Sequence, residues 1–181
     1  MKPASAALTA RLKKIRLVLT DVDGVLTSGT LYHFVDTAGE LVEFKGIHAQ
    51  DSIALAWLAE SGITTGVISG RVSKGTDARM RVLKVKHIYQ HRLDKANVFA
   101  EILKAEGLAP AQALYVGDDL PDLAVMTRAG LAVAPANARD EVKAAAHWTT
   151  KARGGDGAFR EMTEALLKAQ GLWPAIAARY R

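Results

Sequence analysis

Two pairs of carboxylates and a serine stand where they could carry out phosphoryl chemistry. Asp21 and Asp23 follow an apolar, β-branched run, and Asp118 and Asp119 follow another. Ser69 ends a third such run. A carboxylate can attack phosphorus as a nucleophile, and a second one nearby can protonate the leaving oxygen and then activate water. An isolated Asp is more often a cap on a loop or helix, but the repetition of polar residues at three strand ends favours chemistry.

The two acidic pairs also indicate a divalent cation. Asp118 and Asp119 would face Asp21 across one edge of a sheet and would repel it strongly unless a cation lay between them. Hard oxygen ligands that leave room for water suit Mg²⁺. Asp119 has an alternative role, because it stands at the start of a predicted helix and could cap it.

Ser69, Gly70 and Arg71 form a candidate phosphate cradle. A helix is predicted to start here, so the backbone N–H groups of Gly70 and Arg71 could bind an anion, and the guanidinium could add charge. Lys95, at the start of another predicted helix, opposes the helix dipole. A cation is explained there if it neutralises a carboxylate and a phosphate. The alternatives are a helix cap for Ser69 and a surface position for Lys95.

Alternating strands and helices must hold these residues. Apolar runs and amphipathic segments predict strand 15–21, hairpin 31–44, helix 48–62, strand 64–69, helix 72–83, strand 87–90, helix 94–106, strand 113–118, helix 119–129, strand 131–135, helix 138–146 and strand 147–150. A lead-in helix within 1–14 and a final helix within 154–171 complete the chain. The alternation predicts an α/β fold, a doubly wound, mostly parallel Rossmann-like sheet with helices on both faces. Ligands bind such sheets at the carboxyl ends of the strands.

Length and composition limit the class of protein. The 181 residues suffice for one domain, carry a formal net charge of +5 and include no cysteine. Disulfides, thiolate metal sites and a cysteine nucleophile are therefore excluded. The basic residues are scattered in short clusters, which favours an anionic small molecule over nucleic acid. No apolar run reaches the length of a membrane span, and the N-terminus has no signal-peptide core, so we expect a cytoplasmic protein with no membrane partner.

The ordered motifs resemble those of the haloacid dehalogenase-like phosphohydrolases: Asp21-x-Asp23, Ser69, Lys95 and Gly117-Asp118-Asp119. The resemblance implies that Asp21 is the nucleophile and forms an aspartyl-phosphate. It implies that Asp23 is the general acid and base, and that Ser69 and Lys95 hold the phosphoryl group.

The same resemblance implies a magnesium ion. The ion would be bound by Asp21, by the backbone carbonyl of Asp23 and by Asp118, with Asp119 as a supporting carboxylate. An Asp at position 23, rather than an apolar residue, favours phosphate over haloacid chemistry.

Four segments narrow the resemblance to the 3-deoxy-D-manno-octulosonate 8-phosphate phosphatases and their relatives that act on nonulosonate 9-phosphates: TDVDGVLTSG, the hairpin, ISGR and the tail GGDGAFREM. The similarity covers about residues 15–170. It implies a homotetramer, in which hairpins meet centrally and neighbours cover each site, and no cap domain. The sequence agrees on the cap, because no gap between the motifs could hold a compact domain. We therefore expect a single domain over 1–181, with a hairpin at about 30–45 and a tail at about 154–181.

The narrower resemblance implies a small acidic sugar phosphate as substrate, with 3-deoxy-D-manno-octulosonate 8-phosphate as the first choice. Octulosonate phosphatases usually carry Arg-Asp-Gly where this chain has Gln50-Asp51-Ser52. Gln50 cannot match the charge of an arginine against a carboxylate. A nonulosonate 9-phosphate, of the sialic acid or KDN type, is therefore the alternative substrate. Arg71 and Arg160 are candidate anion contacts.

Two other classes of function fit less well. A receiver-like signalling domain also gathers carboxylates, a Ser or Thr and a Lys around Mg²⁺. In receivers, however, the acidic pair ends the first strand and the phosphoacceptor Asp ends a middle strand. Here the Asp-x-Asp-Gly run ends the first strand and the Gly-Asp-Asp run ends a late one. A nucleic-acid binder on the same fold would be recognised by salt-sensitive binding to a duplex.

Overall fold

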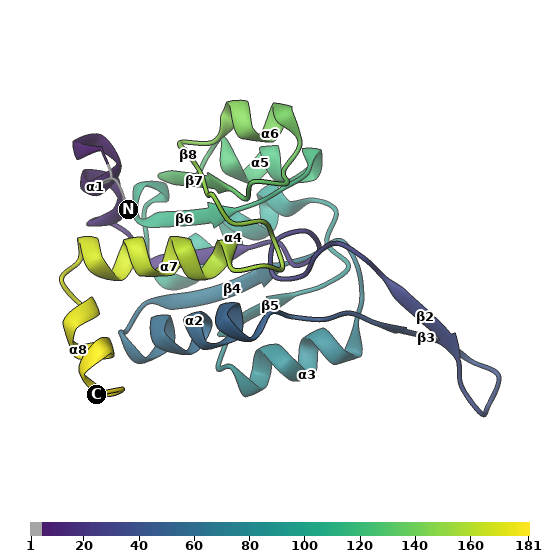
Figure 1. Cartoon of the computed structure of the whole chain (residues 1–181). Helices are drawn as coiled ribbons and strands as arrows, with labels where there is room; N and C mark the ends of the chain where they lie inside the picture. The colour runs from purple at the N-terminus through teal and green to yellow at the C-terminus, as the bar shows by residue number, and fades with distance from the viewer. Residues whose placement is uncertain (1–4) are drawn as a thin grey trace.

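Six parallel strands form the centre of the molecule (Figure 1). The computed structural model of the chain describes residues 5–181. The strand order across the sheet is β5-β4-β1-β6-β7-β8. Three of the inner strands are buried along their whole length, as expected for strands that are covered on both faces. The strands are β1 (Leu17–Thr20), β4 (Thr64–Ile68), β5 (His87–Tyr89), β6 (Ala113–Val116), β7 (Leu131–Ala134) and β8 (Trp148–Thr149).

Helices cover both faces of this sheet, which confirms the predicted doubly wound α/β fold. Buried side chains form one apolar cluster on each side, the first around Phe159 and the second around Phe99. The first face carries α1 (Ala6–Leu12), α2 (Ala49–Glu60), α3 (Lys74–Val82), α7 (Ala158–Ala169) and α8 (Trp173–Ala178). The second face carries α4 (Lys95–Glu106), α5 (Leu123–Met126) and α6 (Asp140–Ala145). Among residues 5–181, no helix is both long enough and apolar enough to cross a bilayer.

Two stretches differ from the sequence-based expectation. The helix expected over 119–129 is divided into a 3₁₀ turn, η2 (Leu120–Asp122), and the short α5. Pro121 stands in the first turn of η2, where it needs no N–H partner. The tail contains a second helix, α8, that was not predicted; Gly171, with a φ of +73°, separates it from α7. A further 3₁₀ turn, η1 (Pro110–Gln112), precedes β6.

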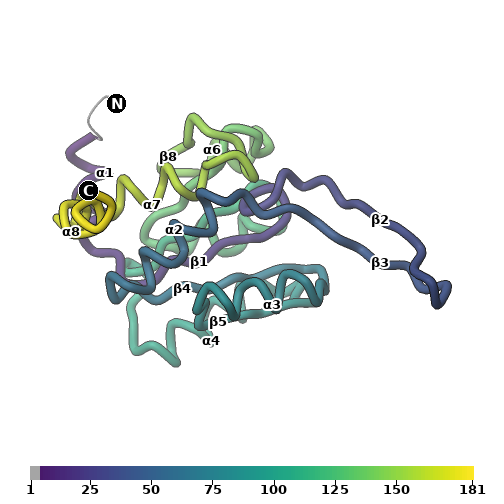
Figure 2. Tube along the Cα trace, turned by 60° about the horizontal axis from the view of Figure 1, so that its bottom comes forward, coloured from purple at the N-terminus to yellow at the C-terminus, as the bar shows by residue number. Residues whose placement is uncertain are grey.

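The predicted hairpin consists of two antiparallel strands, β2 (Tyr32–Val35) and β3 (Leu41–Phe44). It projects away from the body of the molecule as a long arm (Figures 1 and 2). The carboxylate of Asp36 closes its turn by accepting the N–H groups of Ala38 and Glu40, each at 2.9 Å. Five large apolar side chains remain exposed on the arm: Tyr32, Phe34, Val35, Leu41 and Phe44.

Candidate active site

The three central strands end beside one another and bring the predicted polar residues together. Asp21 follows β1, Ser69 follows β4, and Asp118 lies two residues after β6. β4 and β6 both pair with β1, so all three positions meet at the carboxyl edge of the sheet. A pocket of about 200 Å³ opens there. Its lining includes every predicted site residue except Arg160: Asp21, Asp23, Ser69, Gly70, Arg71, Lys95, Asp118 and Asp119.

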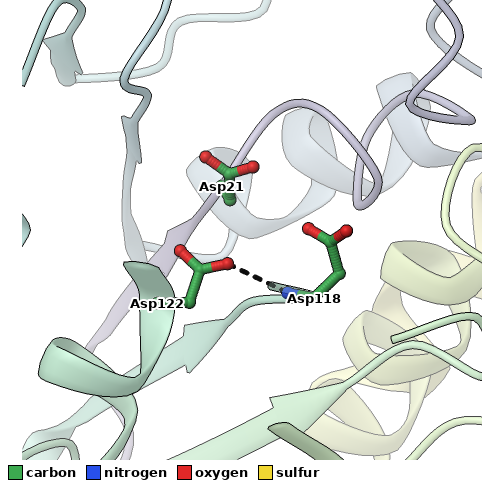
Figure 3. A group of neighbouring side chains, drawn as sticks. All are labelled: Asp21, Asp118 and Asp122. Carbon is green, nitrogen blue, oxygen red and sulfur yellow. Dashed lines mark hydrogen bonds between the residues drawn. The ribbon is translucent and has the colours of Figure 1, made fainter. Parts of the chain in front are cut away.

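Three carboxylates point toward one another at the base of this pocket (Figure 3). One oxygen each from Asp21, Asp118 and Asp122 lies within 4.8 Å of the others. Sequence reasoning did not single out Asp122. Its carboxylate accepts the N–H groups of Asp118 at 3.0 Å and Asp119 at 3.3 Å, which fixes the turn that leaves β6. The spacing Asp119-x-x-Asp122 before a helical turn is a capping signal that could have revealed it.

Lys95 contacts two of these carboxylates. The helix α4 begins at Lys95, and its ammonium lies 2.8 Å from Asp21 Oδ1 and 2.7 Å from Asp122 Oδ1. The hydroxyl of Tyr115, which is fully buried in β6, donates to the same Asp122 oxygen at 2.8 Å. The ammonium of Lys95 is therefore paired with the carboxylate of Asp21. Asp122 also contacts this ammonium, and Tyr115 holds Asp122 in place.

Burial and mutual repulsion make Asp21 and Asp118 hard to ionise. Burial, with Asp122 nearby and despite Lys95, raises the pKa of Asp21 from 3.8 to about 6. Burial and the charges of Asp21 and Asp122 raise the pKa of Asp118 from 3.8 to about 8. Burial alone would lower the pKa of Lys95, but its attraction to Asp21 and Asp122 outweighs that effect and raises it.

These observations fit a divalent cation at Asp118. Its Oδ1 atom is buried and finds no hydrogen-bond partner in the part of the chain that the structure describes. An unpaired, buried carboxylate oxygen is costly unless a cation balances it. The donors around it are carboxylate oxygens, the ligand type that Mg²⁺ prefers. The residues present therefore fit a magnesium ion.

Asp23 lies on the loop that follows β1, at the side of the pocket. The ammonium of Lys45 contacts both of its carboxylate oxygens, at 2.7 and 3.0 Å. The next residue, Gly24, has a φ of +94°, and a Cβ there would overlap the carboxylate of Asp118. The amide of Asn137 donates to the Gly24 carbonyl at 3.1 Å. The loop is thus held close to the acidic cluster by contacts that only glycine permits.

The predicted phosphate cradle is a loop rather than a helix start. The helix α3 begins four residues after Gly70, at Lys74, and Ser73 rather than Ser69 caps it. The Arg71 N–H donates to Ser69 Oγ at 3.2 Å. The Arg71 guanidinium lies 3.5 Å from Glu43 on the hairpin. The Ser69 hydroxyl and the Gly70 backbone still line the pocket, as predicted.

Two other predicted contacts have different surroundings. Asp119 is exposed at the mouth of the pocket, and its carboxylate caps η2 by accepting the Leu120 N–H at 2.8 Å. The guanidinium carbon of Arg160 lies 3.9 Å from the ring centre of Trp57, and its Nε donates to Glu164 at 2.7 Å. Asp122 thus supports the acidic cluster more directly than Asp119. Arg160 does not line the catalytic pocket of the described chain.

The segment Gln50-Asp51-Ser52 anchors the tail. Asp51 is completely buried in the first turn of α2. Its carboxylate accepts the N–H groups of Gly157 at 3.2 Å and Arg160 at 2.8 Å, where α7 begins. Gln50 is exposed and is absent from the lining of the catalytic pocket. Within the described chain, the segment therefore contacts α7 and does not line the pocket at the carboxyl edge of the sheet.

The geometry belongs to a known class of proteins. A family model of the haloacid dehalogenase-like hydrolases matches residues 83–162, which include Lys95, Asp118 and Asp122. Asp21, which follows β1, lies outside the matched residues. The chain belongs to the haloacid dehalogenase-like hydrolases, as the motif resemblance implied.

Relatives along nearly the whole chain define the family within that class. The 3-deoxy-D-manno-octulosonate 8-phosphate phosphatase of Escherichia coli strain K12 is 38% identical over 169 residues, 93% of this chain and 88% of the relative. A Moraxella catarrhalis 3-deoxy-D-manno-octulosonate 8-phosphate phosphatase structure, in complex with magnesium, phosphate and KDO, is 33% identical with a TM-score of 0.92, covering 98% of this chain and 100% of that one. The cobalt-bound deoxy-D-mannose-octulosonate 8-phosphate phosphatase of Haemophilus influenzae is 37% identical with a TM-score of 0.83, covering 89% of this chain and 92% of that one. The chain belongs to this phosphatase family.

Proposed function

We propose that this phosphatase hydrolyses 3-deoxy-D-manno-octulosonate 8-phosphate and uses Mg²⁺. The observation that carries the proposal is the acidic cluster of Asp21, Asp118 and Asp122 beside Lys95, in a chain whose relatives bear the name of that activity. A nonulosonate 9-phosphate was the alternative substrate because Gln50 replaces an arginine. Gln50 is absent from the pocket lining of the single chain, so the replacement does not alter that lining, and the substrate panel below decides between the two esters.

The side chains of the site can divide the reaction into two steps. Asp21 attacks phosphorus, so that a bond forms from its oxygen while the bond from phosphorus to the sugar oxygen breaks. The electron pair goes to the sugar oxygen, and Asp23 protonates it. Asp23 then takes a proton from water, which attacks phosphorus and releases phosphate and free Asp21. Lys95 and Ser69 stabilise charge on the transferring oxygens.

The metal would add charge to this arrangement. Asp21 and Asp118, with the backbone carbonyl of Asp23, would hold Mg²⁺, which supplies positive charge to the phosphoryl oxygens when it is bound. Lys95 contacts Asp21 Oδ1 at 2.8 Å and so fixes the orientation of this carboxylate. Asp122 keeps the backbone of Asp118 in place through its contact at 3.0 Å.

Phosphate release from a panel of esters tests the proposal. The panel contains 3-deoxy-D-manno-octulosonate 8-phosphate, nonulosonate 9-phosphates, hexose phosphates and p-nitrophenyl phosphate, each with Mg²⁺. We expect a clear preference for the octulosonate ester and no turnover by Asp21→Asn. A preference for a nonulosonate would overturn the substrate, and undiminished turnover by Asp21→Asn would overturn the mechanism.

The hairpin supports the proposed homotetramer. Its five exposed apolar side chains lie on an arm that projects from the body, where they are costly to leave in water. The rings of Tyr32 and Phe44 stack with their centres 5.2 Å apart, so the arm presents a preformed apolar surface. Light scattering should give a tetramer for the wild type and smaller species for Phe34→Ser. A monomeric wild-type protein would contradict the proposal. A cytoplasmic location stays a prediction of the sequence.

A further inference from the structure

Lys45 is a buried cation that the reaction outlined above does not use. It directly follows β3, at the base of the hairpin, and only 3% of its side chain is exposed. Its ammonium lies 2.7 and 3.0 Å from the two oxygens of Asp23 and 3.3 Å from Glu43. Burying an ammonium costs free energy unless carboxylates compensate it, so these contacts define one preferred position for the side chain.

The contact joins two segments that no strand pairing connects. Asp23 belongs to the loop after β1, whereas Lys45 and Glu43 belong to the hairpin, 22 and 20 residues further along the chain. Glu43 also lies 3.5 Å from the Arg71 guanidinium on the loop after β4. The base of the hairpin therefore holds two loops of the catalytic pocket through a row of alternating charges.

We propose that Lys45 is a positioning residue, which orients the carboxyl group of Asp23 toward the leaving oxygen of the substrate. The inference rests on the proposed function, in which Asp23 gives its proton to the sugar oxygen as the bond to phosphorus breaks. The carboxylate that remains on Asp23 lies beside the Lys45 ammonium. Contact with both oxygens fixes the plane of the carboxyl group, which a single contact would leave free to rotate.

A positioning role predicts that the effect of losing Lys45 depends on the leaving group. A sugar alkoxide is a strong base and needs a proton as it leaves, whereas p-nitrophenolate is a weak base and leaves without one. The ratio kcat/KM reports the steps through the first phosphoryl transfer, before water attacks. A fault in phosphate binding, metal binding or folding would lower kcat/KM for both esters alike.

The experiment measures kcat/KM of Lys45→Met for 3-deoxy-D-manno-octulosonate 8-phosphate and for p-nitrophenyl phosphate. We expect a loss of about 10- to 100-fold for the sugar ester, below the full contribution of a general acid, and less than about threefold for the aryl ester. Lys45→Arg, which keeps the charge, should recover most of the lost activity. The matched control is Lys86→Met, because Lys86 pairs with Glu106 outside the catalytic pocket; we expect no change for either ester.

Equal losses for both esters, or no loss for either, would overturn the role of Lys45. If Lys45→Met does not fold, Lys45→Gln replaces it and must show the same discrimination. Asp23→Asn separates this inference from the proposed function. If Asp23→Asn discriminates between the esters and Lys45→Met does not, only the Lys45 inference fails. If Asp23→Asn treats both esters alike, the assignment of Asp23 as the acid fails first. Glucose 6-phosphate serves as the alkyl ester if the octulosonate ester is not turned over.

Discussion

Replacing Asp118 with Asn should stabilise the metal-free protein at pH 8. Among residues 5–181, Asp118 has no cation partner of its own, since Lys95 contacts Asp21 and Asp122 instead. Burial and the neighbouring carboxylates raise its pKa from 3.8 to about 8. The folded state therefore favours the protonated form. The contribution of this proton to the free energy of unfolding is fully present below about pH 4, and it is lost as the pH rises through 8.

The size of the effect follows from the separation of the carboxylates. The oxygens lie within 4.8 Å of one another, and two unit charges at that upper limit repel each other by about 3.5 kcal/mol at an effective dielectric constant of about 20. Asp118 is partly accessible to solvent, which screens the repulsion, so we expect a gain of about 1–3 kcal/mol. For a chain of this length, that gain raises the melting temperature by about 3–8 °C.

Thermal unfolding in EDTA and in millimolar Mg²⁺, at pH 5 and pH 8, measures this effect. In EDTA, Asp118→Asn should melt above the wild type at pH 8 and close to it at pH 5. In Mg²⁺ the wild type should gain stability at pH 8, and the variant should gain little. Asp119→Asn is the control, because this exposed neighbour loses the same charge but retains an amide cap. It should keep the Mg²⁺ response. An Asp118→Asn protein that melts at or below the wild type in EDTA at pH 8 would refute the reasoning.

Three further substitutions test other contacts of the site. Tyr115→Phe removes one donor to Asp122 and should lower stability by about 1 kcal/mol in urea unfolding, with turnover retained; unchanged stability would mean that the hydroxyl contact contributes nothing. Gly24→Ala places a methyl group on the Asp118 carboxylate. It should reduce turnover by more than about 100-fold and abolish the thermal stabilisation by Mg²⁺, while the circular dichroism spectrum remains native. Normal turnover would contradict the close approach of Gly24 to Asp118. Asp51→Ala leaves the N–H groups of Gly157 and Arg160, at the start of α7, without an acceptor. The free energy of unfolding should fall by about 2–4 kcal/mol in the same assay. A fall below about 0.5 kcal/mol would argue against the anchoring role of Asp51.

The fold and the centre of the site were predictable because both depend on local patterns. Buried parallel strands are continuous apolar runs, and the polar residue that ends each run marks the carboxyl edge of the sheet. Asp21, Ser69 and Asp118 were found in this way, and the structure brings them to one pocket. Lys95 was notable because a cation at a helix start opposes the dipole, but that pattern left a surface position open, and the motif resemblance assigned the residue to the site.

The remaining contacts depend on tertiary structure and left no local signal. Lys45 reaches Asp23 because the base of the hairpin lies beside the loop after β1. Arg160 lies near a sequence motif, but the helical position of its side chain turns it onto Trp57. Asp51 stands at the start of α2, where a carboxylate normally caps its own helix. Its carboxylate instead accepts N–H groups at the start of α7. In each case the partner is distant in sequence, so spacing alone could not identify it.

The charge balance of the pocket explains why the cation matters for binding as well as for chemistry. When Asp21, Asp118 and Asp122 are all ionised, the ammonium of Lys95 leaves this cluster with two uncompensated negative charges. A phosphate ester brings up to two more into the same pocket. A divalent cation held by Asp21 and Asp118 would supply the positive charge that balances this excess. The charge of Asp23 is balanced separately, because the ammonium of Lys45 contacts both of its carboxylate oxygens.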